Sequence, residues 1–237
     1  VIGESNKDIF IYCEADRLAP DLPVPVLHTL RSTENPGMAK NVERNILSIY
    51  PNCDILTNRN WDSITKLRYI HEKSNHMFLR VDSPHNIKPL DISEISFDYD
   101  LIVVADYNKG FLTEDAIEYI CKNHDLVLLD TKKPLGKWAE GATFIKINDY
   151  EFLRSLPGIN HSLMEKIIHT RGKFGCTFRG KDYSVAQVEV MDTSGAGDTF
   201  MAGFAVRYLL SGNIEESIEY ANQCASEAVK KRGVNTI

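Results

Sequence analysis

The sequence has 237 residues, enough to bury the core of one large α/β domain or of two small ones. With 43% hydrophobic and 25% charged residues, its composition is that of an ordinary globular protein. The net charge of -6 provides no positive surface for nucleic acid or an anionic membrane, so we expect neither as a partner. A phosphorylated ligand would therefore need local positive charge.

The cysteines are dispersed, and no two of them have the spacing of a metal site or a redox pair. This pattern is typical of reduced thiols that pack in a core. No apolar run approaches the length of a membrane span, and no charged-then-apolar leader precedes Val1. We therefore expect a cytoplasmic protein.

The first residues predict short strands and an extended arm. Val1–Gly3 is predicted to end a strand in a tight turn, and Ile9–Tyr12 and Val24–Leu27 are predicted to be two further strands. Repeated prolines in Arg17–Val26 remove backbone donors, which places this segment at a sheet edge or in an extended arm.

Asn35–Asn45 is predicted to be a loop that runs into a helix. Its asparagines either cap the helix start or face a ligand, and the residues alone leave both readings open. Further along, Ser63–Ile70 and Met77–Asp82 alternate like an antiparallel pair of strands, joined through a turn at His71–His76. Without a third ligand nearby, the two histidines of this turn do not indicate a metal site.

From Leu101 onward, strands and helices alternate. Three apolar runs are each followed by a polar residue: Leu101–Ala105 by Asp106, Leu126–Leu129 by Asp130, and Phe144–Ile147 by Asn148. This pattern is typical of buried parallel strands with a ligand crevice at their carboxyl ends. Other predicted elements are helices over Thr113–Lys122, Asp149–Leu156 and Ile214–Lys231, and strands over Cys176–Arg179 and Tyr183–Val190.

The stretch Asp192–Phe200 predicts an anion-binding helix start. Gly195 and Gly197 lack side chains where a backbone must approach a ligand, and the apolar spacing after them is helical. Unpaired N–H groups and the positive end of the helix dipole would suit a phosphate. Asp198 would repel a phosphate but could accept a proton from a hydroxyl that attacks one. A glycine-rich turn followed by an acid-capped helix explains the pattern without a ligand.

The string Asp192–Asp198 (DTSGAGD) resembles the DTxGAGD signature of the ribokinase-like (PfkB) carbohydrate kinases. The resemblance implies that Gly195, Ala196 and Gly197 form an anion hole, that Asp198 is the catalytic base and that ATP is the phosphate donor. It also implies a mostly parallel α/β sheet flanked by helices, with a small β-stranded lid. The chain would then be a single kinase domain over residues 1–237, with lid segments at about 9–31 and 63–82.

A narrower similarity is to the D-glycero-D-manno-heptose-7-phosphate kinase domain of ADP-heptose biosynthesis proteins. It rests on Gly3, Asp8, the Pro-rich arm and two strings, Asp106–Gly110 (DYNKG) and Asp130–Lys132 (DTK). The two similarities together imply a substrate site formed by Asp8, Gly37, Asn41, Arg80, Asp106 and Lys109.

The resemblance to the ribokinase-like kinases also implies which residues bind Mg²⁺ and ATP. Asn148–Glu151 keeps the family's NxxE string, which implies that Asn148 and Glu151 hold Mg²⁺, largely through water. The residues implied for ATP binding are Lys132, Asn148, Glu151, Thr170, Gly172, Gly175 and Asn222.

The sequence also departs from this family. The strand, helix and strand expected after Asn45 are reduced to Leu47–Thr57, so about one βα unit is missing, and Met38 replaces a glycine of the sugar-binding turn. The implied reaction transfers the γ-phosphoryl group of ATP to a heptose 7-phosphate at its anomeric hydroxyl. A kinase of another sugar or nucleoside remains an alternative, as does a shortened nucleotide-binding pseudokinase or regulatory subunit, although an intact Asp198 argues against the latter. Exposed edges of the lid predict a homodimer formed through it.

Overall fold

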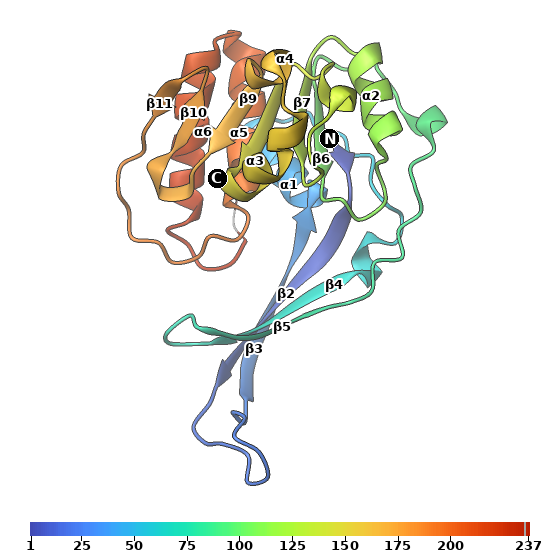
Figure 1. Ribbon diagram of the computed structural model, residues 1–237. Helices are drawn as coiled ribbons and strands as arrows, with labels where there is room; N and C mark the ends of the chain where they lie inside the picture. Colours follow the sequence, from blue (N-terminus) through green and yellow to red (C-terminus); the bar gives the residue numbers. More distant parts are fainter. Residues whose placement is uncertain (235) are drawn as a thin grey trace.

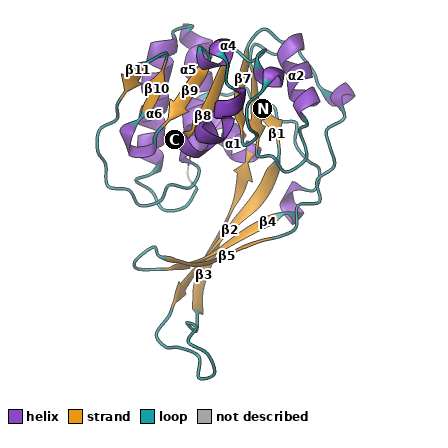
Figure 2. Ribbon diagram, viewed as in Figure 1, coloured by secondary structure: helices purple, strands orange, loops and turns teal. Residues whose placement is uncertain are grey.

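The computed structural model describes residues 1–234 and 236–237, which form two β-sheets of different character (Figure 1). The larger sheet has the strand order β1-β6-β7-β8-β9-β10-β11 and is flanked by helices. The smaller sheet has the order β3-β2-β4-β5 and extends away from the helices (Figure 2). The predicted fold class, a mostly parallel sheet flanked by helices with a small β-stranded extension, is confirmed.

The larger sheet is parallel from β1 to β9 and antiparallel from there to β11. Its strands are β1 (Ile2–Gly3), β6 (Ile102–Asp106), β7 (Val127–Thr131), β8 (Phe144–Asn148), β9 (Ile167–Thr170), β10 (Cys176–Phe178) and β11 (Lys181–Tyr183). Every residue of β6 and β7 is buried, as expected for parallel strands that are covered on both faces. The polar residue predicted to follow each of the three apolar runs is thus included in the strand.

Helices cover both faces of this sheet. They are α1 (Ala39–Ile49), α2 (Glu114–Asn123), α3 (Asp149–Ser155), α4 (His161–Met164), α5 (Ala196–Ser211) and α6 (Ile214–Ala228). Because successive strand residues point to opposite faces, Val104 and Leu129 pack with α2, whereas Val103 and Leu128 pack with α1, α5 and α6. Short 3₁₀ helices occur at Trp61–Ser63, Ile92–Glu94, Lys137–Ala139, Leu156–Gly158 and Gly172–Phe174. No helix of the described residues is long and apolar enough to cross a membrane.

The smaller sheet consists of β2 (Ser5–Glu14), β3 (His28–Met38), β4 (Thr65–His71) and β5 (Met77–Asp82). The predicted antiparallel pairing of β4 with β5 is confirmed, and β2 pairs with β4 in parallel. Phe10, Tyr12 and Ile70 are buried on one face of this sheet and pack with Val234 near the end of the chain. This face, which we call the inner face, is therefore turned toward the larger sheet and its helices.

Two segments differ from their predicted structure near the Pro-rich arm. Val24–Leu27 is not a strand, because within it only Pro25 pairs, in an isolated bridge with Leu18. The strand instead begins at His28 and continues through Asn35–Met38, which was predicted to be a loop. Prolines keep the arm out of the ladder, whereas Pro36 is accepted in β3 because β3 is an edge strand.

The prediction of a strand over Tyr183–Val190 is also wrong. Strand β11 ends at Tyr183, and residues 184–190 have no regular structure. The shortened region Leu47–Thr57 contributes the end of α1 and one isolated bridge, in which Leu56 pairs with Ile2. Strand β1 consequently lies at the edge of the larger sheet.

Candidate active site

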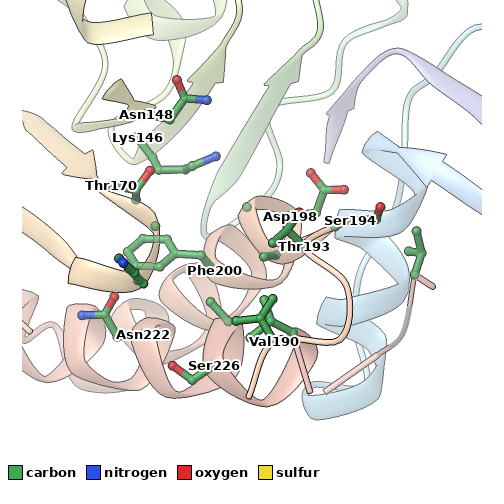
Figure 3. A pocket seen from close by; sticks show the side chains of 18 of the residues that line it. Lys146, Asn148, Thr170, Val190, Thr193, Ser194, Asp198, Phe200, Asn222 and Ser226 are labelled. Atoms are coloured by element: carbon green, nitrogen blue, oxygen red, sulfur yellow. The ribbon is translucent and has the colours of Figure 1, made fainter. Parts of the chain in front are cut away.

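A cavity of about 950 Å³ lies between the inner face of the smaller sheet and the larger sheet with its helices (Figure 3). Its walls come from the carboxyl ends of the parallel strands, the start of α5, one side of α6 and the segment after β11. The predicted site residues that line it are Asp8, Lys132, Asn148, Thr170, Gly172, Gly175, Gly195, Ala196, Gly197, Asp198 and Asn222. The fold thus brings together residues that are far apart in the sequence.

The start of α5 has the backbone geometry that the glycine spacing predicts. Gly195 precedes the helix with φ 80°, a left-handed conformation that glycine adopts at little cost. A Cβ atom at Gly195 would lie 2.9 Å from Nδ2 of Asn41, and one at Gly197 would lie 3.0 Å from Nζ of Lys146. Gly195 has no side chain to cap this helix, and the N–H of Ala196 donates to the backbone oxygen of Thr193 at 3.3 Å. Gly195, Ala196 and Gly197 line the cavity, so the positive end of the helix dipole lies beside it.

Asp198 lies in the first turn of α5, and both its carboxylate oxygens accept hydrogen bonds. Oδ1 accepts one from the hydroxyl of Tyr107, and Oδ2 accepts one from Nδ2 of Asn41 at 2.7 Å. Burial raises the pKa of Asp198 above its ordinary value, while the two hydrogen bonds act in the opposite direction. A carboxylate with a raised pKa is better matched to accept a proton near neutral pH.

Asn41 and Gly37, both predicted to bind substrate, lie beside the cavity without lining it. Asn41 is buried on α1, where its own side-chain oxygen accepts a hydrogen bond from Nδ2 of Asn45 at 3.2 Å. Its amide is therefore oriented toward Asp198. Gly37 leaves space for Asp8, because a Cβ atom there would lie 2.2 Å from Oδ2 of that residue.

Two lysines at the ends of β7 and β8 bring positive charge to the cavity wall. Lys146 donates to Oδ2 of Asp130 at 2.6 Å, and Lys132 lies 2.5 Å from Oε1 of Glu151 and 3.4 Å from Asp130. Burial alone would raise the pKa of Asp130, but the two ammonium groups hold it below its ordinary value. Burial alone would lower the pKa of Lys132, but Asp130 and Glu151 raise it. The Asp130 carboxylate and the Lys132 ammonium therefore stay charged near neutral pH.

The pair implied for magnesium is already engaged within the protein. Oε2 of Glu151 accepts from the backbone N–H of Asn148 at 2.9 Å, and Oε1 accepts from its Nδ2 at 2.9 Å. Oδ1 of Asn148 in turn accepts from the N–H of Glu151 at 3.0 Å, which closes a capping box at the start of α3. Direct coordination of Mg²⁺ by this pair does not fit the arrangement. Asn148 and Glu151 could therefore contact Mg²⁺ only through water. Within the described part of the chain, no group of three His, Cys, Asp or Glu side chains could hold a metal ion.

Besides Asn41 and Gly37, three further predicted substrate residues lie outside the cavity lining. Asp106 is buried and accepts hydrogen bonds from the Thr131 hydroxyl at 2.5 Å and from Nζ of Lys133 at 2.7 Å. Arg80 makes two hydrogen bonds of 2.7 Å to Asp82 on the same strand. Lys109 lies in the loop after β6. In this conformation Asp106 fixes the ends of two strands, and the structure does not bring these three residues to the cavity surface.

The nucleotide-side residues lie at the other end of the cavity. Gly175 has φ 83°, and a Cβ atom there would lie 2.0 Å from the backbone oxygen of Tyr183. Asn222 donates to the same oxygen at 3.1 Å from α6. The predicted residues Thr170, Gly172, Gly175 and Asn222 all line the cavity, as do Val185, Ala186, Val188 and Val190. Thr170 and Asn222 lie on the side of the cavity away from Asp198 (Figure 3).

Sequence reasoning assigned no role to Tyr107, Lys66 and Arg68, which also line the cavity. Tyr107 binds Asp198, and Nη1 of Arg68 donates to Oδ1 of Asp8 at 2.6 Å. Tyr107 belongs to the DYNKG string, so a signal for it was present. Lys66 and Arg68 are two residues apart on β4 and so share one face of the strand. That this face is turned toward the cavity follows only from the pairing of β4 with β2.

Comparison with known proteins agrees with this geometry. Residues 55–237 match the model of the pfkB family carbohydrate kinases, and the chain belongs to this family. It is therefore a carbohydrate kinase, a phosphotransferase of a family whose members use ATP. Its fold resembles that of ribokinase from Thermotoga maritima, with a TM-score of 0.73 at 16% identity over 99% of this chain and 94% of that one. The ribokinase of Arabidopsis thaliana, solved with ribose and ATP, gives a TM-score of 0.67 at 15% identity over 98% and 92% of the two chains.

A relative among curated proteins is the bifunctional protein HldE of Helicobacter pylori (strain Shi470), which is 29% identical. The alignment covers 98% of this chain and 63% of the relative, so the chain spans less than two thirds of the relative's length. It runs over 294 positions, more than the 237 residues of this chain. The relative therefore carries segments within the aligned region that this chain lacks, in line with the predicted shortening.

Proposed function

We propose that this kinase transfers the γ-phosphoryl group of ATP to a sugar phosphate, a heptose 7-phosphate that is attacked through its anomeric hydroxyl. The observation that carries the proposal is the position of Asp198 in the first turn of α5, in a cavity that Lys66 and Arg68 of the smaller sheet also line. Similarity to the bifunctional protein HldE and the DYNKG string support a heptose over other sugars.

In this proposal Asp198 takes the proton of the attacking hydroxyl as the new bond to phosphorus forms. The backbone N–H groups at Gly195–Gly197 stabilise charge on the transferring group, and Lys146 lies beside them. Lys132 contributes a second fixed positive charge at the cavity wall. When bound with the nucleotide, Mg²⁺ supplies further neutralisation of the phosphates, and Asn148 with Glu151 would contact its water shell.

The test is ADP formation with heptose 7-phosphate and with a panel of other sugars and nucleosides. We expect Asp198→Asn to lower turnover by about 10²- to 10⁴-fold, because a positioned base is lost. ATP binding should be nearly unchanged. Asp182→Asn is a matched control, since Asp182 is exposed and paired with Arg171 away from the base. Turnover of Asp198→Asn within a few-fold of the wild type would remove Asp198 from this role, and turnover of another sugar alone would replace the heptose.

A further inference from the structure

The inner face of the smaller sheet carries a cluster of charged side chains beside the cavity. In the sheet register, Lys66 of β4 lies opposite Asp8 of β2 and Asp82 of β5. Arg68 of β4 lies opposite Arg80 of β5. Because directly opposed residues point to the same face, all five side chains share the inner face.

Each carboxylate of this cluster already has an arginine as its partner. Asp8 accepts from Arg68 at 2.6 Å, and Asp82 accepts two hydrogen bonds of 2.7 Å from Arg80. Among the residues that the structure describes, none forms a hydrogen bond or an ion pair with the ammonium group of Lys66. Yet Lys66 is only 8% exposed and lines the cavity. A buried ammonium without a counter-ion is costly, so a site of this kind is completed by an anion.

A second unpaired polar atom lies in the same region. Nδ1 of His85 is buried and has no hydrogen-bond partner within the described residues. Burial lowers the pKa of His85, and the charges of Lys109, Lys66 and Arg80 lower it further. Lys109, Lys66 and Arg80 are thus each close enough to His85 to act on it electrostatically.

Tyr107 connects the charged cluster with Asp198, because it contacts both Lys66 and Asp198. Nζ of Lys66 lies 5.8 Å from the centroid of the Tyr107 ring, whereas the hydroxyl of the same ring donates to Asp198. An acceptor that offers a hydroxyl to Asp198 would therefore extend along Tyr107 toward Lys66. A sugar that carries a phosphate away from the attacked hydroxyl could place that phosphate beside Lys66.

We propose that Lys66, with Arg80, His85 and Lys109 around it, forms a subsite for the phosphate group of a phosphorylated sugar acceptor. This subsite rests on the proposed function, because it selects a phosphosugar over a free sugar at the same active site. It gives Arg80 and Lys109 a role although neither lines the cavity, since both act electrostatically on His85 and so add positive potential to the region of Lys66.

The test measures binding by calorimetry and turnover by ADP formation for Lys66→Met, which keeps the length of the side chain and removes its charge. We expect affinity for heptose 7-phosphate to fall about 10- to 100-fold, the range for a lost charged hydrogen bond. Affinity for the unphosphorylated heptose and for ATP should not change. Lys7→Met is the matched control, because Lys7 lies on the other face of β2 and pairs with Glu34.

Lys66→Arg should retain most of the affinity, which separates loss of charge from misfolding. Equal affinity of the wild type and Lys66→Met for heptose 7-phosphate would overturn the subsite, as would an equal loss of affinity for the free heptose. Inorganic phosphate provides a readout that does not depend on turnover. If the wild type phosphorylates no sugar phosphate, the proposed function fails, but the subsite stands if phosphate binds the wild type and not Lys66→Met. Absence of phosphate binding to the wild type would overturn the subsite as well.

Discussion

The carboxylate of Asp198 is held from both sides before any substrate reaches it. Tyr107 donates to one oxygen and Asn41 to the other, so rotation of the carboxylate would break two hydrogen bonds. Each carboxylate oxygen can accept more than one hydrogen bond, which leaves room for the hydroxyl of an acceptor. The base is therefore oriented in advance and needs no rearrangement to accept a proton.

Replacement of Tyr107 by phenylalanine should move the pH dependence of turnover. Asp198 can act as a base only when ionised, so kcat/KM falls as the pH drops through its pKa. The Tyr107 hydrogen bond lowers this pKa, and burial raises it. In Tyr107→Phe the pKa should therefore rise, and the acidic limb of the kcat/KM profile should move to higher pH. Tyr99→Phe is a suitable control, because Tyr99 is exposed and binds Asp54. A limb that stays in place or moves to lower pH would contradict this role of Tyr107.

At this scale, the sequence predicted the residues that belong to continuous strings and missed those defined by distant contacts. Gly195, Gly197 and Asp198 are neighbours in the chain, and their spacing alone indicated an anion site. Tyr107 belongs to the DYNKG string, but its contact with Asp198 spans 91 residues of sequence, so the string indicated the residue without revealing its partner. Lys66 is distinctive only because, within the part of the chain that the structure describes, no carboxylate of β2 or β5 forms an ion pair with it.

At the scale of elements, β3 passes into α1 without an intervening loop. Met38, the last residue of β3, has φ 61° and ψ -130°, a conformation that residues other than glycine rarely adopt. This is the position where the family's sugar-binding turn has glycine. Met38 is buried and lines the cavity, so packing of its side chain offsets part of the backbone strain. The backbone therefore runs directly from β3 into α1, the helix that carries Asn41.

Local sequence signals were misleading here for a physical reason. Pro36 and Gly37 are turn residues by composition, and the prediction of a loop over Asn35–Asn45 follows from them. Pairing of β3 with β2 continues to Met38 nevertheless, because tertiary contacts override local preference at a sheet edge. The buried runs of β6, β7 and β8 were predicted well, since continuous apolar stretches depend little on their context.

Closure of the smaller sheet over its ligands should be visible by hydrogen exchange. With heptose 7-phosphate and ATP bound, exchange should slow together in Asn35–Asn45 and Met77–Asp82, because ligand contacts must break before these segments open. At ligand concentrations about 100 times Kd, protection should increase by about 100-fold where opening requires dissociation. The Leu126–Asp130 segment is the internal control, since it lies in the buried part of the larger sheet. Unchanged exchange in both Asn35–Asn45 and Met77–Asp82, with binding shown independently, would rule out closure.

At the scale of the whole molecule, the smaller sheet has an outer face that carries exposed apolar side chains. Leu79 and Val81 of β5 are 53% and 44% exposed, and they pair with Tyr69 and Leu67 on the face opposite the charged cluster. Strands β3 and β5 are the two edges of this sheet. Exposed edges and apolar surface of this kind are commonly covered by another chain.

We predict that two copies of the chain associate through this outer face. Light scattering should give the mass of a homodimer at tens of micromolar, and Leu79→Glu should shift it to the monomer. Leu210→Glu is the matched control, because Leu210 is similarly exposed but lies at the end of α5. An active wild-type monomer at this concentration would contradict the prediction.

The hydrogen bond between Asn41 and Asp198 joins residues that are 157 positions apart, and this separation has a consequence for folding. Contacts of such length form late, because the entropy of closing a long loop is lost before the contact is gained. During synthesis, α1 and the smaller sheet also leave the ribosome well before α5. We therefore expect the Asp198 carboxylate to meet its two donors late in folding, and nascent chains that end before α5 lack this carboxylate altogether.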